Sequence, residues 1–378
     1  MALYLLLFFL SLLLAVYENQ KLDYYGNITL DVYQRPLAYP MVWFMFAAFM
    51  CIVGFRYKLG GTDYICYHSF YELIKAKHSF WTAISTSQYE IGYTTFVYLC
   101  AKILHLSYEG SLFIEAFIFY ILMYEGLKKY IPNWGLFFMF FIYKMFFYVT
   151  FVAMRQAFTI AGFFVIMRYL EERKWIKYYA SLALVATFHY GALILFVLYP
   201  FFGLRISKKR LLYFGVIFAM LTLLSNLTGN LLNFVVNLLG LNQLEDKAAD
   251  YSSFKESLNI LYTIEYFMLY VLVVKHYDDL KERFANTDFW VMMFLMVLPI
   301  VTLFRSTLIL VRELFYFYPA YAVLVYYLYY ISRSRIAIFS VFVSICLLGM
   351  LKYIIQFDDG HFMHYKTWLF DSSINFFQ

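Results

Sequence analysis

Apolar stretches of about 20 residues recur from one end of this chain to the other, and they constrain its fold more than any other feature. An α-helix needs about 20 apolar residues to cross a bilayer, because each residue adds about 1.5 Å to its length. Of the 378 residues, 64% are hydrophobic and only 14% are charged. This composition excludes a soluble globular protein and indicates an all-α, polytopic integral membrane protein.

We expect about 11–13 transmembrane or re-entrant helices on this pattern. The expected helices are 2–17, 37–55, 110–124, 133–152, 156–171, 175–188, 190–204, 211–229, 257–275, 288–304, 307–331 and 336–355. A further segment, 91–105, should lie at the interface or dip into the bilayer without crossing it. The polar breaks 56–90 and 240–256 are expected to be outer loops. No linker divides the chain, so residues 1–378 are expected to form a single transmembrane domain.

Two basic clusters determine the expected orientation, because short loops rich in lysine and arginine stay in the cytoplasm. The clusters lie at 168–177 and 205–210. The segment between them has only about 27 residues, too few for two standard crossings. We therefore expect a hairpin of two short helices, with its tip at 188–191 inside the outer leaflet. By the same reasoning, Arg155 and His189 should lie at similar depth on the outer side.

Arg155 stands near the middle of an apolar and aromatic stretch, 132–170. Its guanidinium cannot lose a proton, and placing it at bilayer depth costs roughly 2.5–3.5 kcal/mol. The side chain therefore needs a partner, a water-filled cavity or an anionic ligand. An arginine in such a place is a functional-site hypothesis by itself.

Four short motifs follow one another between residues 55 and 192. They read FRYKLGGTDYICY (55–67), YEIGY (89–93), MRQA (154–157) and ATFHYGA (186–192). Together they resemble the EpsG-like branch of the bacterial Wzy polysaccharide polymerases, which make O-antigens, capsules and exopolysaccharides. Beyond residue 192 the resemblance is one of general character only.

Three positions depart from the pattern of that family. An extra residue precedes Gly61-Thr62-Asp63, Ile91 replaces a proline, and Gly191 replaces a serine. The last change removes a hydroxyl, so no role is transferred to position 191.

The resemblance implies a glycosyltransferase with the C type of glycosyltransferase fold (GT-C). Such an enzyme transfers a growing glycan from undecaprenyl diphosphate onto the next lipid-linked repeat unit, at the outer face of the bacterial inner membrane. The lipid diphosphate is the leaving group, so no cofactor, nucleotide sugar or metal is expected. The expected partners are the undecaprenyl-diphosphate-linked oligosaccharide and the bilayer, with a flippase and a chain-length regulator as candidates. Neither the net charge of +6 nor any basic arm indicates nucleic acid.

A departing diphosphate needs cations that stay charged, and arginine binds phosphate through two parallel N–H groups. Four arginines fall on the outer side of the expected topology: Arg56, Arg155, Arg305 and Arg312. The last two are seven residues apart and share one face if their helix is continuous. The alternative is that each arginine pairs with a carboxylate, the candidates being Glu313, Glu90 and Asp63, or extends to the membrane interface.

The acceptor hydroxyl must lose its proton to a general base, for which His189, Asp63 and Glu90 are candidates. Asp63 could equally serve as the cap of a helix, and Glu90 suits a helix N-terminus. The sequence does not choose among the three. Candidate substrate contacts are Tyr64, Tyr67, Gln156 and Tyr190. No cluster of ligands with metal-binding spacing is present.

Two other functions share these features. A glycan ligase would use the same leaving group with a different acceptor. A transporter or flippase for lipid-linked sugars would also contain broken helices and charges within the membrane.

Overall fold

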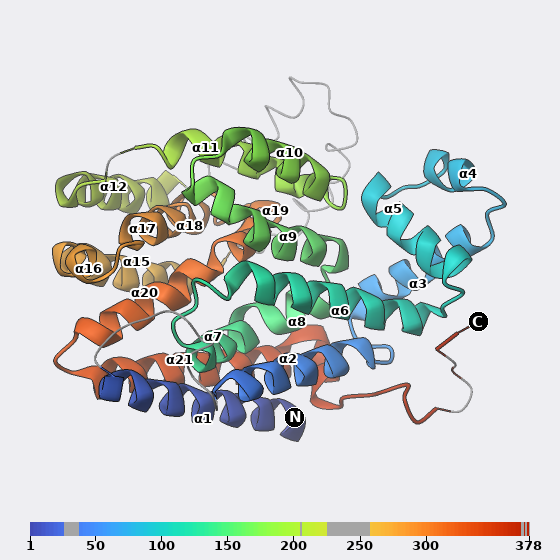
Figure 1. Ribbon diagram of the computed structural model, residues 1–378, viewed down its shortest axis with the longest axis horizontal. Helices are drawn as coiled ribbons and strands as arrows, with labels where there is room; N and C mark the ends of the chain where they lie inside the picture. The colour runs from blue at the N-terminus through green and yellow to red at the C-terminus, as the bar shows by residue number, and fades with distance from the viewer. Residues whose placement is uncertain (26–37, 205, 225–257, 372–373, 375, 378) are drawn as a thin grey trace. The chain divides into compact units, whose positions relative to one another are not determined.

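The computed structural model describes residues 1–25, 38–204, 206–224, 258–371, 374 and 376–377 (Figure 1). The expected loop 240–256 lies outside these residues. Among the described residues the secondary structure is helical, apart from the isolated bridges Arg56–Thr367 and Leu106–Phe377. Four helical stretches there are long and apolar enough to cross a membrane: Ala2–Asn19, Tyr108–Leu127, Trp134–Phe151 and Arg335–Gln356. The prediction of an all-α, polytopic membrane protein is confirmed.

The chain forms two compact units. The first contains Met1–Pro200 and Ser340–Gln378, and the second contains Phe201–Phe339. The single domain expected from the sequence stays a prediction.

Helices of four to 24 residues, several of them rich in aromatic side chains, form the main body of the first unit. They are α1 (Ala2–Tyr25), α2 (Ala38–Gly54), α6 (Tyr108–Leu127), α7 (Trp134–Phe141), α8 (Phe147–Phe151), α9 (Met154–Glu171), α10 (Trp175–Ala186), α11 (Leu198–Phe201) and most of α21 (Arg335–Gln356). Helix α6 packs against α2 and α9, while α7 packs against α1. Every residue of α7 is buried, as expected of a helix that is apolar all round and surrounded by others. A π-helical turn, Ile142–Phe146, joins α7 to α8.

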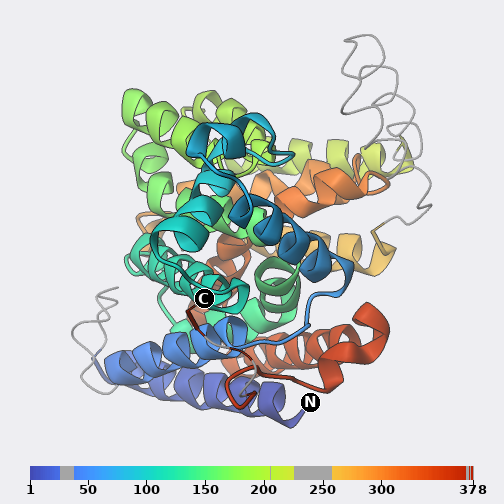
Figure 2. The same cartoon turned by 90° about the vertical axis from the view of Figure 1, so that its right-hand side faces the viewer.

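The segment 56–90 is not an open loop, which corrects the expectation from sequence. It contains α3 (Gly61–Lys75) and α4 (Phe80–Ser85), and these pack with α5 (Ile91–Tyr98) (Figure 2). Their buried side chains form one cluster, which includes Tyr67, Phe70 and Tyr93. The segment reads as polar because one face of each short helix is exposed, while the aromatic residues of the other face form a core.

The short hairpin predicted between the two basic clusters is present. Helix α10 forms the first arm, and a 3₁₀ segment (Tyr190–Val197) followed by α11 forms the second. The Tyr178 hydroxyl of the first arm donates a hydrogen bond to the Leu195 carbonyl of the second, at 2.7 Å. Because 3₁₀ geometry leaves some carbonyls poorly satisfied, this hydrogen bond across the hairpin stabilises the second arm.

Segment 91–105 comprises α5 and a π-helix, Leu99–Ile103. Just beyond its end, the Ser107 amide donates a hydrogen bond to the Phe376 carbonyl of the C-terminal tail, at 2.9 Å. The expectation that this segment does not cross the bilayer stays a prediction.

The second unit contains shorter helices and several breaks. Its elements are α12 (Lys208–Leu221), a 3₁₀ turn (Thr222–Leu224), α15 (Ile260–Lys275), α16 (Tyr277–Arg283), α17 (Thr287–Leu295), α18 (Val297–Val301), α19 (Leu308–Val311), a 3₁₀ turn (Arg312–Tyr316) and α20 (Tyr318–Ile331), with the first residues of α21. The helix expected at 307–331 is therefore interrupted, and non-helical residues lie between α18 and α19. Arg305 and Arg312 therefore do not lie on one continuous helix, and the condition for their sharing a face is not met.

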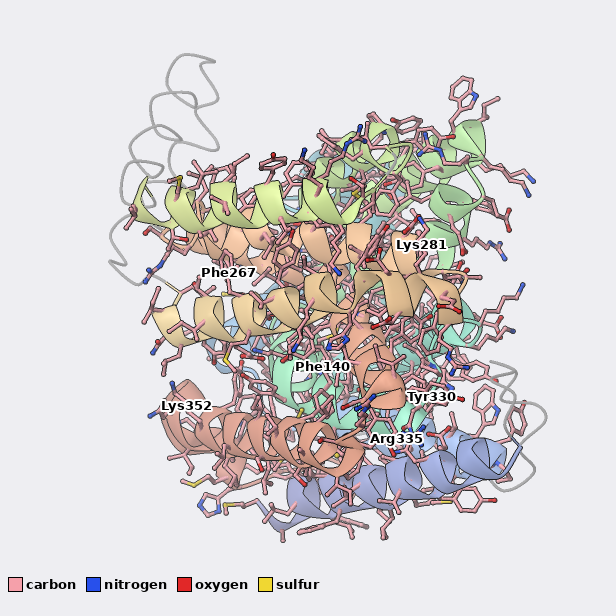
Figure 3. The ribbon with its side chains drawn as sticks, turned by 90° about the vertical axis from the view of Figure 1, so that its left-hand side faces the viewer. Phe140, Phe267, Lys281, Tyr330, Arg335 and Lys352 are labelled. Carbon is pink, nitrogen blue, oxygen red and sulfur yellow. The ribbon has the colours of Figure 1, made fainter. Side chains whose placement is uncertain are left out.

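Basic side chains contact neighbouring groups within this unit. The Lys208 ammonium lies 3.0 Å from the Lys275 carbonyl and 3.2 Å from the Asp278 carboxylate. Arg335 lies over the ring of Tyr330, 5.3 Å from its centre (Figure 3). The cytoplasmic side expected for the basic clusters stays a prediction.

Candidate functional site

The carboxylate of Glu90 is the centre of the polar cluster that the sequence predicted around Arg155. Glu90 is the N-cap residue of α5, with extended backbone, and its side chain is only 7% exposed. One oxygen, Oε2, pairs with the Arg155 guanidinium. The other, Oε1, lies 3.2 Å from His189 Nδ1 and accepts a hydrogen bond from the Tyr190 amide, also at 3.2 Å. A single carboxylate thus joins an arginine to a histidine.

Arg155 lies in the first turn of α9 and is held on three sides. Its Nη1 contacts Glu90, and its Nε donates a hydrogen bond to the Tyr67 hydroxyl at 3.3 Å. The guanidinium also lies over the Tyr89 ring, 4.2 Å from its centre, where a cation–π interaction stabilises the charge. The Arg155 side chain remains 19% exposed, so it is not completely enclosed by these three contacts.

His189 stands at the tip of the hairpin, directly before its 3₁₀ arm. Its Nδ1 faces Glu90, and the side chain is 27% exposed. A carboxylate beside Nδ1 holds the proton on that nitrogen and leaves Nε2 as an acceptor. This arrangement suits a histidine that takes a proton from a substrate.

A glycine lets α5 approach the hairpin tip closely. The Gly92 amide donates a hydrogen bond to the Thr187 carbonyl at 2.8 Å. A Cβ atom at Gly92 would lie 2.4 Å from Thr187 Oγ1, closer than real Cβ contacts. The glycine of the second motif therefore lets Glu90 reach His189.

Each of the four motifs contributes to this cluster. Tyr67 comes from the first, Glu90 from the second, Arg155 from the third and His189 from the fourth. Up to 100 residues separate the contacting pairs. Segments far apart in the chain thus meet at one place in the first unit.

The carboxyl of Glu90 has a strongly lowered pKa. Burial by itself would raise it, but the hydrogen bond with His189 and the positive charge of Arg155 outweigh burial and lower the pKa to about 2. The Tyr67 hydroxyl behaves differently, because burial raises its pKa to about 12 even beside Arg155. Glu90 is therefore ionised at neutral pH and is a weak base.

The other predicted side chains of the first unit surround the cluster or lie in the core. Asp63 lies in the first turn of α3, and the N-cap residue of that helix is Gly60 rather than Asp63. The expectation that Asp63 caps the helix is therefore not met, and its catalytic role stays a prediction. Tyr64 is buried and contacts Glu109 at 3.3 Å, and Gln156 is buried next to Arg155 in α9. Tyr190 is 59% exposed, and its backbone amide donates the hydrogen bond to Glu90.

Arg56 does not belong to the Glu90 cluster. It is 1% exposed, its Nη1 donates a hydrogen bond to the Thr150 carbonyl at 2.6 Å, and it lies over the Phe151 ring at 5.1 Å. Its position joins the end of α2 to the end of α8. In this conformation the guanidinium is out of reach of a ligand.

Arg305 and Arg312 lie in the second unit. Arg305 Nη2 donates a hydrogen bond to the Leu258 carbonyl at 3.2 Å, and Arg312 opens the 3₁₀ turn next to Glu313. Their expected contact with a diphosphate stays a prediction.

Sequence reasoning missed Tyr89 as a site residue. Its ring lies against the Arg155 guanidinium, and it directly precedes Glu90 in the second motif. An aromatic residue next to a motif carboxylate was the available signal. Within the described residues, no three histidine, cysteine or carboxylate side chains are arranged to hold a metal ion; the expectation that the protein uses no metal or cofactor stays a prediction.

Comparison with known proteins identifies the family. The model of the EpsG family matches residues 39–367, which is most of the chain. The chain belongs to the EpsG family. No curated protein and no solved structure matches it significantly.

All four motifs of the EpsG pattern, and thus the whole Glu90 cluster, lie inside the matched range. Membership of this family and the apolar helices identify a membrane protein of polysaccharide biosynthesis.

Proposed function

We propose that this protein is a polysaccharide polymerase with the Glu90 cluster at its active site. It transfers a growing glycan from undecaprenyl diphosphate onto the next lipid-linked repeat unit. The reaction takes place at the outer face of the bacterial inner membrane, where the predicted topology puts the hairpin tip. The convergence of all four motifs on Glu90, Arg155 and His189 carries this proposal.

In the proposed reaction, the acceptor hydroxyl attacks the anomeric carbon of the donor sugar. The new C–O bond forms as the bond to the lipid diphosphate breaks, and the diphosphate leaves with the bonding electrons. Arg155, whose side chain is 19% exposed, stabilises the charge that develops on the leaving group. Its contacts with Tyr67 and Tyr89 keep it in place before substrate arrives.

The proton of the acceptor hydroxyl passes to Nε2 of His189. Among the three candidate bases, Glu90 is disfavoured because a carboxyl with a pKa of about 2 holds a proton too weakly at neutral pH. Glu90 instead orients His189 and neutralises part of the charge that this residue acquires.

Purified full-length protein in nanodiscs, supplied with a lipid-diphosphate-linked oligosaccharide, tests the proposal. Arg155→Ala should slow chain growth by about 10²–10³-fold, and His189→Gln by about 10²–10⁴-fold. Arg168→Ala is the matched control, because it removes an exposed arginine from the last turn of the same helix. That variant should retain wild-type chain growth.

A normal polymer ladder from Arg155→Ala protein would overturn the proposal. Transfer of glycan to a different acceptor, without chain growth, would identify a ligase. Movement of the lipid-linked unit between leaflets, without any new glycosidic bond, would identify a transporter.

A further inference from the structure

A basic pocket of about 490 Å³ lies in the first unit, apart from the residues that contact Glu90. Two segments form it: residues 58–59, just before α3, and residues 360–366, which follow α21. Its side-chain lining consists of Lys58, Leu59, His361, Met363, His364 and Lys366.

Backbone contacts hold the two sides of this pocket together. The Tyr57 amide donates a hydrogen bond to the Lys366 carbonyl at 3.0 Å, and the Trp368 amide donates one to the Phe55 carbonyl at 3.1 Å. The N-terminal ammonium donates a hydrogen bond to the Met363 carbonyl at 2.6 Å. The lysines are thus carried by paired main chain, which limits how far they can move apart.

The backbone conformation at Lys58 and Gly60 also limits how far the lysines can move. Lys58 has a left-handed conformation, with φ of 52°, which is costly for a residue with a side chain. Gly60, two residues later, has φ of 127°, and a Cβ atom there would lie 2.4 Å from the Phe151 carbonyl. Close packing of Gly60 on α8 therefore determines the course of the loop that carries Lys58.

Of the lining residues named above, two are lysines and two are histidines, and none of those named carries a carboxylate. Some lysines elsewhere in this unit pair with acids, such as Lys75 with Glu72 and Lys174 with Glu172. Among the described residues, neither Lys58 nor Lys366 has such a pair. Two ammonium groups and two imidazoles around one cavity favour an anion with several acceptor oxygens.

The depth of the pocket indicates where the anion comes from. Helix α2 ends at Gly54 and α21 ends at Gln356, so the pocket lies just beyond the ends of two apolar helices. Lipid phosphate groups lie at this level of a bilayer, directly outside the hydrocarbon. We propose that the pocket binds the phosphate of a membrane lipid, either an anionic phospholipid headgroup or the diphosphate of a lipid-linked substrate.

Native mass spectrometry of the full-length protein in detergent tests this binding with three probes: phosphatidylglycerol, farnesyl diphosphate and phosphatidylcholine. The variant Lys58→Gln/Lys366→Gln should weaken binding of one anionic probe by about tenfold or more, because each charged hydrogen bond to phosphate is removed. The matched control is Lys177→Gln/Lys352→Gln, which removes two exposed lysines of the same unit outside the pocket (Figure 3 labels Lys352).

If the glutamine variant loses binding of phosphatidylglycerol alone, the pocket is a headgroup site. If it loses binding of farnesyl diphosphate alone, the pocket is a substrate site. Because farnesyl diphosphate can also bind at Arg155, each variant is repeated with Arg155→Ala, which should leave the pocket unaffected. The variant Lys58→Arg/Lys366→Arg keeps both positive charges and should retain binding. Such a result would show that substitution at these positions does not by itself disrupt the fold. Unchanged binding of both anionic probes in the glutamine variant, or an equal loss in the control, would overturn the proposal.

Discussion

Glu90 has two carboxylate oxygens with different partners, and this division determines what the cluster can do. Oε2 neutralises Arg155, while Oε1 contacts His189 and the Tyr190 amide. Removing the charge of Glu90 would leave a largely buried guanidinium without its counter-ion and a histidine without its orienting partner. The same carboxylate therefore contributes to both stability and the proposed chemistry.

The substitution Glu90→Gln tests the stability contribution through its dependence on pH. The pKa of Glu90 is lowered from 4.5 to about 2, so its contribution is complete above about pH 4.5 and is lost as the pH falls toward 2. We expect the free energy of unfolding at pH 7 to be on the order of 2 kcal/mol larger for the wild-type protein than for the variant. Melting temperatures in detergent should show this gap shrinking by roughly half or more at pH 3.

Glu72→Gln provides the control for that measurement. Glu72 is half exposed and pairs with Lys75 at 3.7 Å, so its loss should change stability by less than about 0.5 kcal/mol at either pH. A gap between wild type and Glu90→Gln that stays constant from pH 7 to pH 3 would contradict the lowered pKa.

The start of α5 and the tip of the hairpin act as one element, because Gly92 packs directly on Thr187. The contact between Glu90 and His189 depends on this close approach. The extra helices of segment 61–85 contribute as well, since Tyr67 of α3 holds the other side of Arg155. The site thus depends on helix packing more than on any loop conformation.

We expect Gly92→Ala to separate these two elements. The added methyl would lie 2.4 Å from Thr187 Oγ1 and 2.8 Å from its carbonyl, so α5 must shift. Overpacking of this kind costs about 1–3 kcal/mol. Chain growth should fall together with melting temperature, as His189 loses its contact with Glu90.

The neighbouring variant Ile91→Ala is the comparison for this change. Ile91 is 48% exposed, so its shortening should leave chain growth intact. Wild-type chain growth by Gly92→Ala protein would show that the close contact is not needed for function.

The topology of the chain as a whole can be tested with its own cysteines. Cys66 in α3 is exposed, whereas Cys100 and Cys346 are buried and Cys51 is partly buried. If segment 56–90 is on the outer side, a membrane-impermeant maleimide should label Cys66 in right-side-out vesicles. Cys66→Ser should then lose the labelling.

Lys177→Cys, made in the Cys66→Ser protein, reports on the opposite side. Lys177 is exposed near the start of α10, in a loop expected to be cytoplasmic. This cysteine should react only after the vesicles are opened. The reverse pattern, with Cys66 protected until opening, would invert the orientation and put the Glu90 cluster on the cytoplasmic side.

The amino-acid sequence by itself determined the membrane class, the short hairpin and the family pattern. Helix-length apolar runs and basic loops are local properties, so they can be read without knowing which helices touch. The same local properties placed Arg155 and His189 at similar depth, and in the structure both contact Glu90.

Tertiary structure alone decided which carboxylate pairs with Arg155. The sequence left Glu313, Glu90 and Asp63 open, because pairing over 65 residues depends on how α3, α5 and α9 pack. Packing also buried Arg56. Its position in the sequence, just after an apolar helix, did not indicate that burial. Long-range contacts of this kind are set by the shapes of buried aromatic side chains, which sequence periodicity does not encode.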